Sequence, residues 1–294
     1  MTPRARLRDM LRQRKLVVAP GGYDAATAML IEGAGFEAAY MTGAGVSATF
    51  GLPDYGLLSM SEMAEQVGRI TSAVSIPLIA DADTGYGNEL NVTRTIRAYE
   101  ERGVAALHLE DQVSPKRCGH LTGKEVVPRA EFVAKIRAAV AARRDPDLII
   151  IARSDARASL GFDEAVARVN LAIEAGADVG FVEAPQSLEE AAQVPKVVKG
   201  PCLLNMVMGG RTPVFDLAEV GRMGYAMVIA PALVPGIMVS SVARALDAFK
   251  RSGVHPALPG NLTPADIFAH FGSARWDALR TKFQESFGAD DHLR

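Results

Sequence analysis

The stretch LHLEDQVSPKRCGHLTGKE, residues 107 to 125, brings together several residue types that could do chemistry. Glu110 and Asp111 end an apolar run, and in the loop that follows Cys118 lies between two cationic residues and His120. Neighbouring positive charge favours the thiolate form of a cysteine and helps it to exchange protons near neutral pH. The loop therefore favours a chemical role for Cys118 over a structural one.

Polar residues also end the other apolar runs of the sequence. Ionisable side chains are expensive to bury there unless they are paired or bind a metal. Strand periodicity puts Asp81 and Asp83 on one side, next to Glu110 at the end of the adjacent strand. Three such carboxylates predict a site for a hard cation such as Mg²⁺ or Mn²⁺, and zinc is disfavoured because no His/Cys set has ligand spacing. The residues at these ends are Asp81, Asp83, Glu110, Asp111, Arg153, Ser154, Asp155, Glu183 and Asn205.

Simpler roles are available to the same residues. The acids could cap the following helices or pair with arginines, although three acids on neighbouring strands favour a site. Arg153 could grip a substrate carboxylate with two parallel hydrogen bonds, or form a structural ion pair with Asp155 or Glu183. His108 lies inside an apolar run and could be a core histidine, so its role stays open.

The elements that must position these side chains repeat along the chain. Short apolar or β-branched runs alternate with amphipathic helical stretches, several of which end in glycine. Eight such units predict an α/β fold, a closed (β/α)8 barrel of the TIM type over residues 1–250, in which chemistry lies at the C-terminal ends of the strands. An open doubly wound sheet is the alternative, but no switch point and no Gly-x-Gly-x-x-Gly after the first run support it. The predicted strands are 16–20, 38–43, 77–83, 105–111, 148–156, 179–184, 202–207 and 227–232.

The last part of the chain differs from these units. A further helix is expected after the eighth strand, and prolines with an expected N-cap at Thr263 then begin a new helical segment. We expect residues 251–294 to form a helical extension that packs on the barrel or on a neighbouring subunit.

Composition excludes several classes of partner. The 294 residues are 49% hydrophobic and 22% charged, with a formal net charge of −2, so nothing indicates nucleic acid or an anionic membrane surface. No apolar run approaches the length of a membrane span. Residues 1–16 are basic and amphipathic but lack the features of a secretory signal, so we expect a short capping helix there rather than a transit peptide. Two cysteines suit a reducing cytoplasm.

Several motifs, taken in order, make the sequence similar to a known family. YMTGAGVSATFGLPD, PLIADADTGYG, HLEDQVSPKRCGH, IIARSDA, FVEA and LLNMV resemble the isocitrate lyase and phosphoenolpyruvate mutase superfamily over roughly residues 15–250. Within it the chain looks most like the 2-methylisocitrate and 2,3-dimethylmalate lyase branch. The resemblance implies a (β/α)8 barrel whose eighth helix is exchanged between subunits, in a homotetramer built as a dimer of dimers.

The resemblance also implies roles for individual residues. Mg²⁺, or Mn²⁺ in its place, would be held by Asp83 directly, with further acids acting directly or through water. Cys118 would be the general acid/base on a loop that closes over the substrate, with His120 and Glu183 nearby, and Arg153 would face the bond that is broken. The further metal residues implied are Asp54, Asp81 and Glu110, and the substrate-binding residues are Thr42, Gly43, Ala44, Gly119, Arg153 and Asn205.

The implied reaction is a retro-aldol cleavage of a 2-hydroxy di- or tricarboxylate, which gives an α-keto acid such as pyruvate and a carboxylate. Hydrolysis or decarboxylation of oxaloacetate on the same scaffold is the main alternative, and phosphonomutase chemistry is disfavoured because those branches generally lack the cysteine. A barrel that only binds a dicarboxylate is disfavoured by the full set of Asp83, Glu110, Cys118 and Arg153. The segment NMVMGGRTP is expected to help shape the distal part of the pocket, and Met208 within it indicates an apolar substituent on the substrate.

Overall fold

The computed structural model describes residues 1–119 and 123–284. Two compact units divide the chain, Met1–Met238 and Val239–Arg294, and the division falls within helix α10 (Leu233–Ser252). Within the described residues no helix is both long and apolar enough to cross a lipid bilayer.

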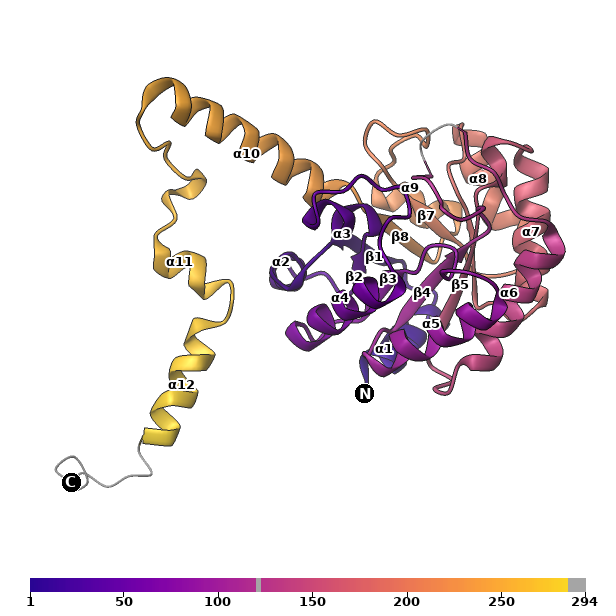
Figure 1. The fold of residues 1–294 in the computed structure, drawn as a ribbon, viewed down its shortest axis with the longest axis horizontal. Helices are drawn as coiled ribbons and strands as arrows, with labels where there is room; N and C mark the ends of the chain where they lie inside the picture. Colours follow the sequence, from indigo (N-terminus) through magenta and orange to yellow (C-terminus); the bar gives the residue numbers. More distant parts are fainter. Residues whose placement is uncertain (120–122, 285–294) are drawn as a thin grey trace. The chain divides into compact units, whose positions relative to one another are not determined.

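Parallel strands form the centre of the first unit (Figure 1). In the described part of the chain eight strands run in the order β6-β5-β4-β3-β2-β1-β8-β7, and an isolated parallel bridge between Gly180 and Cys202 links the two ends. The first strand pairs with both the second and the last, which an open doubly wound sheet does not do. The predicted (β/α)8 barrel is thus confirmed as a nearly closed barrel. Its strands are β1 (Val17–Gly22), β2 (Ala39–Met41), β3 (Leu78–Asp81), β4 (Ala106–Glu110), β5 (Ile149–Ser154), β6 (Val179–Val182), β7 (Leu203–Asn205) and β8 (Met227–Ala230).

Helices between the strands cover the outside of the barrel (Figure 1). Side-chain caps start several of them; Ser59, for example, accepts a hydrogen bond from the backbone of Glu62 and forms a capping box. The expected capping helix is present as α1 (Pro3–Arg12), whose Leu7 and Met10 are buried. The others are α2 (Ala25–Gly33), α3 (Gly43–Thr49), α4 (Met60–Ala73), α5 (Glu89–Glu101), α6 (Arg129–Ala142), α7 (Phe162–Glu174), α8 (Leu188–Val197) and α9 (Leu217–Met223), with a short 3₁₀ turn at Ala156–Ala158.

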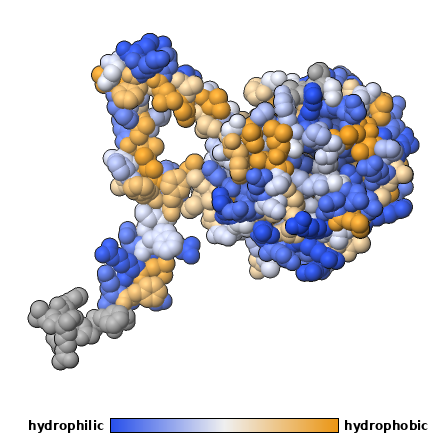
Figure 2. Space-filling view, in the orientation of Figure 1, coloured by the Kyte–Doolittle hydropathy of each residue, from blue (hydrophilic) through white to orange (hydrophobic). Residues whose placement is uncertain are grey.

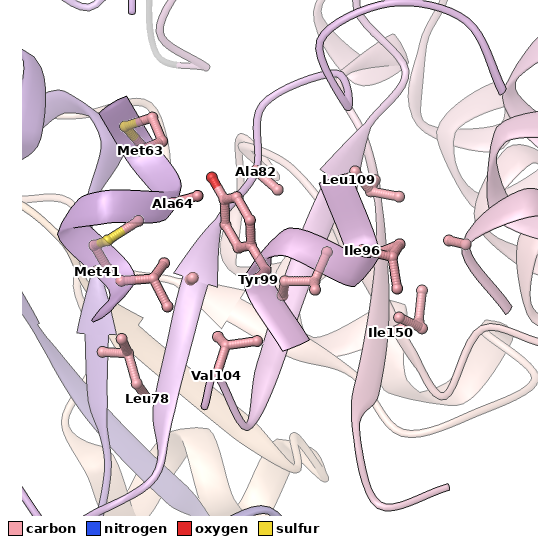
Figure 3. Packing of buried hydrophobic residues seen from close by; sticks show 14 of the residues in the cluster. Met41, Met63, Ala64, Leu78, Ala82, Ile96, Tyr99, Val104, Leu109 and Ile150 are labelled. Carbon is pink, nitrogen blue, oxygen red and sulfur yellow. The ribbon is translucent and has the colours of Figure 1, made fainter. Parts of the chain in front are cut away.

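Alternation along the strands divides the core in two. Ile149 and Ile151 belong to the apolar cluster inside the barrel, whereas Ile150 between them packs against the helices. Ile150 belongs to the apolar cluster between the strands and the helices, and Tyr99 of α5 lies among the residues of the same cluster, close to the strands (Figure 3). Each such side chain contributes about 1.5–3 kcal/mol when it is buried completely. The two layers hold the strand ends rigidly in register.

Helical segments also make up the second unit. Besides the end of α10, it contains a 3₁₀ turn at Pro259–Asn261, α11 (Pro264–Ala269) and α12 (Ser273–Gln284). Thr263 is the N-cap of α11, as expected, and forms a capping box with Asp266. None of α10, α11 and α12 has a buried residue in the single chain, and apolar side chains are visible along this unit in Figure 2.

Candidate active site

A cavity of about 190 Å³ opens at the C-terminal ends of the barrel strands. Residues that belong to seven different strands, or to the segments that follow them, meet there, which is why their spacing along the sequence is so wide. The lining residues are Tyr40, Thr42, Ala44, Asp54, Asp81, Lys116, Cys118, Gly119, Arg153, Glu183, Asn205, Val207, Pro231, Ala232 and Pro235.

Most of the residues predicted from the sequence lie at or next to this cavity. Three of them do not line it but lie directly behind it: Gly43, Asp83 and Glu110. Gly43 packs directly on Asp81, since a Cβ atom there would lie 2.5 Å from Asp81 Oδ2 and would push the carboxylate away. His120 lies outside the described residues. Some lining residues could not be predicted from the sequence, because apolar side chains, and a tyrosine inside an apolar run, do not indicate which cavity they face. These residues are Tyr40, Val207, Pro231, Ala232 and Pro235.

Asp81 and Asp83 reach the site in different ways. The third strand ends at Asp81, so the expected alternation along a strand does not extend to Asp83. Asp83 instead adopts the left-handed conformation, with φ of 46°, and its backbone N–H donates to Asp81 Oδ1 at 3.0 Å. The backbone carbonyl of Asp83 then accepts a hydrogen bond from the N–H of Glu110. A tight turn, not strand periodicity, therefore brings the acids together.

Lys116 neutralises part of this acidic group. Its Nζ atom lies 2.5 Å from Asp54 Oδ1 and 3.0 Å from Asp83 Oδ1, and the side chain is buried. Burial alone would lower the pKa of Lys116, but attraction to Asp83, Asp81 and Asp54 outweighs burial and raises this pKa well above its ordinary value. The other cation beside Cys118, Arg117, lies over the ring of Tyr55. Both cations are thus engaged with partners other than the thiol.

Burial makes some of the carboxylates hard to ionise. It raises the pKa of Asp83 to about 6 despite the nearby Lys116, and it raises the pKa of Glu110 well above its usual range despite Arg153. Asp81 behaves in the opposite way, because His108, Lys116 and Arg153 together outweigh burial and lower its pKa to about 2. The surroundings of Asp81, Asp83 and Glu110 therefore do not stabilise a negative charge on all three carboxylates.

The acids suit a divalent cation in donor type. Both carboxylate oxygens of Glu110 are buried without a hydrogen-bond partner among the described residues, although Oε2 lies 3.1 Å from Arg153 Nη1. Buried carboxylate oxygens without donors are what a hard cation binds. As the side chains stand, however, no three His, Cys, Asp or Glu residues in the described ranges are arranged to hold a metal ion. Binding would require the acids around Lys116 to move.

Arg153 both lines the cavity and forms the structural ion pair considered above. Its Nε atom lies 2.9 Å from Asp155 Oδ2 and its Nη2 atom 3.1 Å from Asp155 Oδ1, so Asp155 fixes the guanidinium plane. Nη2 also lies 3.7 Å from Glu183 Oε1. The two interpretations of Arg153 are therefore compatible.

Gly119 and Glu183 lie on the other side of Arg153. A Cβ atom at Gly119 would clash with Glu183 Oε1 and with Arg153 Nη2, so the chain next to Cys118 packs directly on these two side chains. Asn205 donates through Nδ2 to both carboxylate oxygens of Glu183 at 3.2 Å. Cys118 itself is partly exposed and lines the cavity.

His108 is completely buried, as a core histidine would be. Its Nε2 atom lies 2.8 Å from the hydroxyl of Tyr40 and 3.5 Å from Asp81 Oδ1. Burial lowers the pKa of His108 to about 4, which keeps the imidazole neutral near pH 7. The histidine therefore supports Tyr40 and Asp81 from behind the cavity.

Met208 does not take the place expected for it. Its side chain is 80% exposed and it does not line the cavity. The apolar wall is instead formed by the neighbouring Val207 and by Pro231, Ala232 and Pro235.

Comparisons with known proteins show the family to which the chain belongs. The family model described as phosphoenolpyruvate phosphomutase matches residues 7–250. The 2,3-dimethylmalate lyase of Eubacterium barkeri is 50% identical over 232 residues, which cover 79% of this chain and 80% of that protein.

Two solved structures are similar over almost the whole chain. The structure of oxaloacetate acetylhydrolase in complex with the inhibitor 3,3-difluorooxalacetate has a TM-score of 0.92 at 37% identity and covers 98% of both chains. That of phosphonopyruvate hydrolase in complex with oxalate and Mg²⁺ has a TM-score of 0.87 at 33% identity and covers 97% of this chain and all of that one. The chain belongs to the phosphoenolpyruvate mutase/isocitrate lyase superfamily and is an enzyme of its carbon–carbon lyase class.

Proposed function

We propose that this enzyme cleaves the carbon–carbon bond of a 2-hydroxy di- or tricarboxylate that carries an alkyl substituent, of the 2,3-dimethylmalate or 2-methylisocitrate type. The observation that carries the proposal is the placement of Cys118 in one cavity with Arg153 and an acidic group. Such a cavity has a proton donor, a cation for a developing oxyanion and bases within reach of one small molecule.

The chain's own residues can perform the steps of a retro-aldol cleavage. A carboxylate of the cavity accepts the proton of the substrate hydroxyl, and the electron pair of that O–H bond becomes the second bond of the new carbonyl. The electrons of the broken carbon–carbon bond stay on the carbon next to the departing carboxylate. Arg153 donates hydrogen bonds to the substrate oxygens, and the thiol of Cys118 gives its proton to the carbanion.

We further propose that Mg²⁺, or Mn²⁺ in its place, is held by Asp81, Asp83 and Glu110, with Asp54 beside them. When bound, this cation would supply Lewis-acid polarisation of the substrate oxygen. Support comes from the buried oxygens of Glu110 without hydrogen-bond partners and from the Mg²⁺ in the related hydrolase structure.

The wall formed by Val207, Pro231, Ala232 and Pro235 favours an alkyl-bearing substrate over oxaloacetate. Apolar surface that closes on a methyl or methylene group gains about 0.8 kcal/mol for each CH₂ it buries. The side chains of this wall carry no hydrogen-bond donor or acceptor for a more polar distal group. Oxaloacetate hydrolysis remains the second candidate because of the structural similarity to oxaloacetate acetylhydrolase.

A substrate screen with product identification tests the proposal. The enzyme is incubated with Mg²⁺ and with 2,3-dimethylmalate, 2-methylisocitrate, other 2-alkylmalates or oxaloacetate, and pyruvate is measured with a coupled dehydrogenase while the second product is identified by chromatography. We expect an α-keto acid from an alkyl-substituted substrate, and no turnover by the Cys118→Ser variant. Oxalate from oxaloacetate, with no cleavage of any alkylmalate, would instead show the hydrolase activity.

A further inference from the structure

Lys124 is a buried lysine that the mechanism above does not use. Its side chain is 1% exposed, and its Nζ atom lies 2.8 Å from Asp155 Oδ1. The same ammonium also donates to the backbone carbonyl of Gly119. A buried lysine is costly unless its charge is paired, so this pair of contacts fixes the position of the side chain.

Each of the two acceptors is tied to a group of the candidate active site. Asp155 Oδ1, which faces Lys124, also accepts from Arg153 Nη2 at 3.1 Å. Asp155 is itself held from behind, because its backbone N–H donates to Asp111 Oδ1 at 2.8 Å. One carboxylate thus bridges two buried cations and has little freedom to turn.

Gly119, the other acceptor, follows Cys118 directly in the chain. Its Cα packs so closely on Glu183 and Arg153 that no side chain fits there. A small shift of Gly119 would therefore change both the contact with Arg153 and the position of the neighbouring thiol. Lys124 contacts both the carbonyl of Gly119 and the carboxylate of Asp155, which orients Arg153.

We propose that Lys124 is a positioning residue, which fixes the Cys118–Gly119 segment and the Arg153 guanidinium relative to each other through its ammonium group. For catalysis this role rests on the lyase function proposed above. For the position of Cys118 it does not, because the contacts of Lys124 are independent of the substrate. Loss of the ammonium leaves the Gly119 carbonyl and Asp155 Oδ1 each with one donor fewer in buried surroundings, and the two sides of the cavity lose their link.

The test compares Lys124→Met with Lys135→Met in the full-length enzyme. Lys135 of α6 is the matched control, since it is equally buried, pairs only at 3.5 Å with Glu131 and does not line the cavity. The first measurement is the rate at which iodoacetamide alkylates Cys118, followed by mass spectrometry; the second cysteine, Cys202, is buried. The second measurement separates kcat from KM on the substrate found in the screen.

We expect Lys124→Met to change the alkylation rate of Cys118 several-fold and to lower kcat by about 100-fold, as for a misplacement of about 1 Å, with a smaller change in KM. Lys135→Met should match the wild type in both measurements. The double variant Lys124→Met/Asp155→Asn should lose little activity beyond that of Asp155→Asn, because either substitution breaks the same link from Gly119 through Lys124 and Asp155 to Arg153.

Wild-type alkylation and wild-type kcat in the Lys124 variant would overturn the proposal. If Lys124→Met does not fold, as judged by circular dichroism and thermal melting, Lys124→Gln takes its place under the same criteria, since it retains a donor for Gly119 without the charge. An altered alkylation rate in an enzyme that cleaves none of the tested substrates would support the positioning role and refute the proposed function. If the wild-type enzyme is an active lyase but Lys124→Met is alkylated at the wild-type rate, the proposed function would be supported and the positioning role refuted.

Discussion

At the residue scale, the candidate site combines two kinds of side chain that normally avoid burial. The acids Asp81, Asp83 and Glu110 are buried, and so are the cations Lys116 and Arg153. Despite the ion pair with Arg153, the oxygens of Glu110 have no hydrogen-bond partner in the part of the chain that the structure describes. Buried groups in this state usually mark a functional site rather than a stabilising network.

Removal of divalent metal should therefore abolish turnover. Dialysis against EDTA is expected to eliminate product formation, and added Mg²⁺ or Mn²⁺ should restore it, because the surplus carboxylates need a hard cation. Glu110→Gln should weaken Mg²⁺ binding measured by titration calorimetry, whereas Glu131→Gln on the surface of α6 should not. Full activity in enzyme shown to be metal-free by elemental analysis would contradict the metal site.

The thiol of Cys202, which does not line the cavity, should make the free energy of unfolding depend on pH. Burial raises the pKa of its thiol to about 12, above the value of about 8.5 expected in the unfolded chain. The folded state therefore binds this proton more tightly, so its contribution to stability is complete below about pH 8.5 and is lost as the pH rises towards 12.

Urea unfolding at a series of pH values checks this sign. Between pH 8.5 and 11 the free energy of unfolding should fall more steeply for the wild type than for Cys202→Ala, which has no thiol to ionise. Cys118→Ala is the control for the partly exposed thiol. Parallel curves for the wild type and Cys202→Ala would show that the Cys202 thiol does not titrate differently in the two states.

At the scale of elements, loops after the strands bring the acids, the thiol and the arginine together. Asp83 is placed by a left-handed turn after β3, and Arg153 and Glu110 are neighbours because their strands pair in that register. The segment around Gly119 crosses from β4 to the arginine of β5 and leaves no space for a side chain. A substitution of Gly119 therefore changes how the loop after β4 packs on β5, and removes no catalytic side chain.

Gly119→Ala tests this close approach. The added methyl group would push the segment away from Arg153 and Glu183, so we expect kcat to fall by about 100-fold while the barrel stays folded. Thermal melting measured by circular dichroism should stay close to that of the wild type. Gly33→Ala, where a Cβ would meet nothing within 4 Å, is the control and should have wild-type activity.

At the scale of the whole molecule, helix α10 presents apolar residues that are exposed in the described part of the single chain. Val239, Val242, Leu246 and Phe249 are exposed and recur at the spacing of one helix face. Soluble monomers rarely expose a contiguous apolar surface of this kind. We expect the chain to self-associate through this face, as a homotetramer.

Light scattering after gel filtration measures the assembly directly. The wild type should have four times the mass of one chain, and Leu246→Glu should have a lower mass because it places a charge in the apolar face. Arg244→Glu, on the opposite face of the helix, should leave the mass unchanged. A monomeric wild type would refute the expected assembly.

Local patterns in the sequence determined much of this protein. Alternating short strands and amphipathic helices predicted the barrel, because each pattern depends only on which face of an element is buried. The polar residues Asp81, Glu110, Arg153 and Glu183 at strand ends predicted the place of the site, because parallel strands bring their C-terminal ends to one edge.

Only the tertiary structure decided how these residues are arranged. Lys116 binds Asp54 and Asp83, and Lys124 joins Gly119 to Asp155. These contacts depend on the paths of loops, because they join residues up to 62 positions apart in the chain. The segment around Met208 was expected to shape the distal part of the pocket, but Met208 itself does not line the cavity, and Val207 and the Pro231 region form its apolar wall. Apolar side chains carry no signal of which cavity they face, since the same types also fill the core, and only packing in three dimensions separates the two.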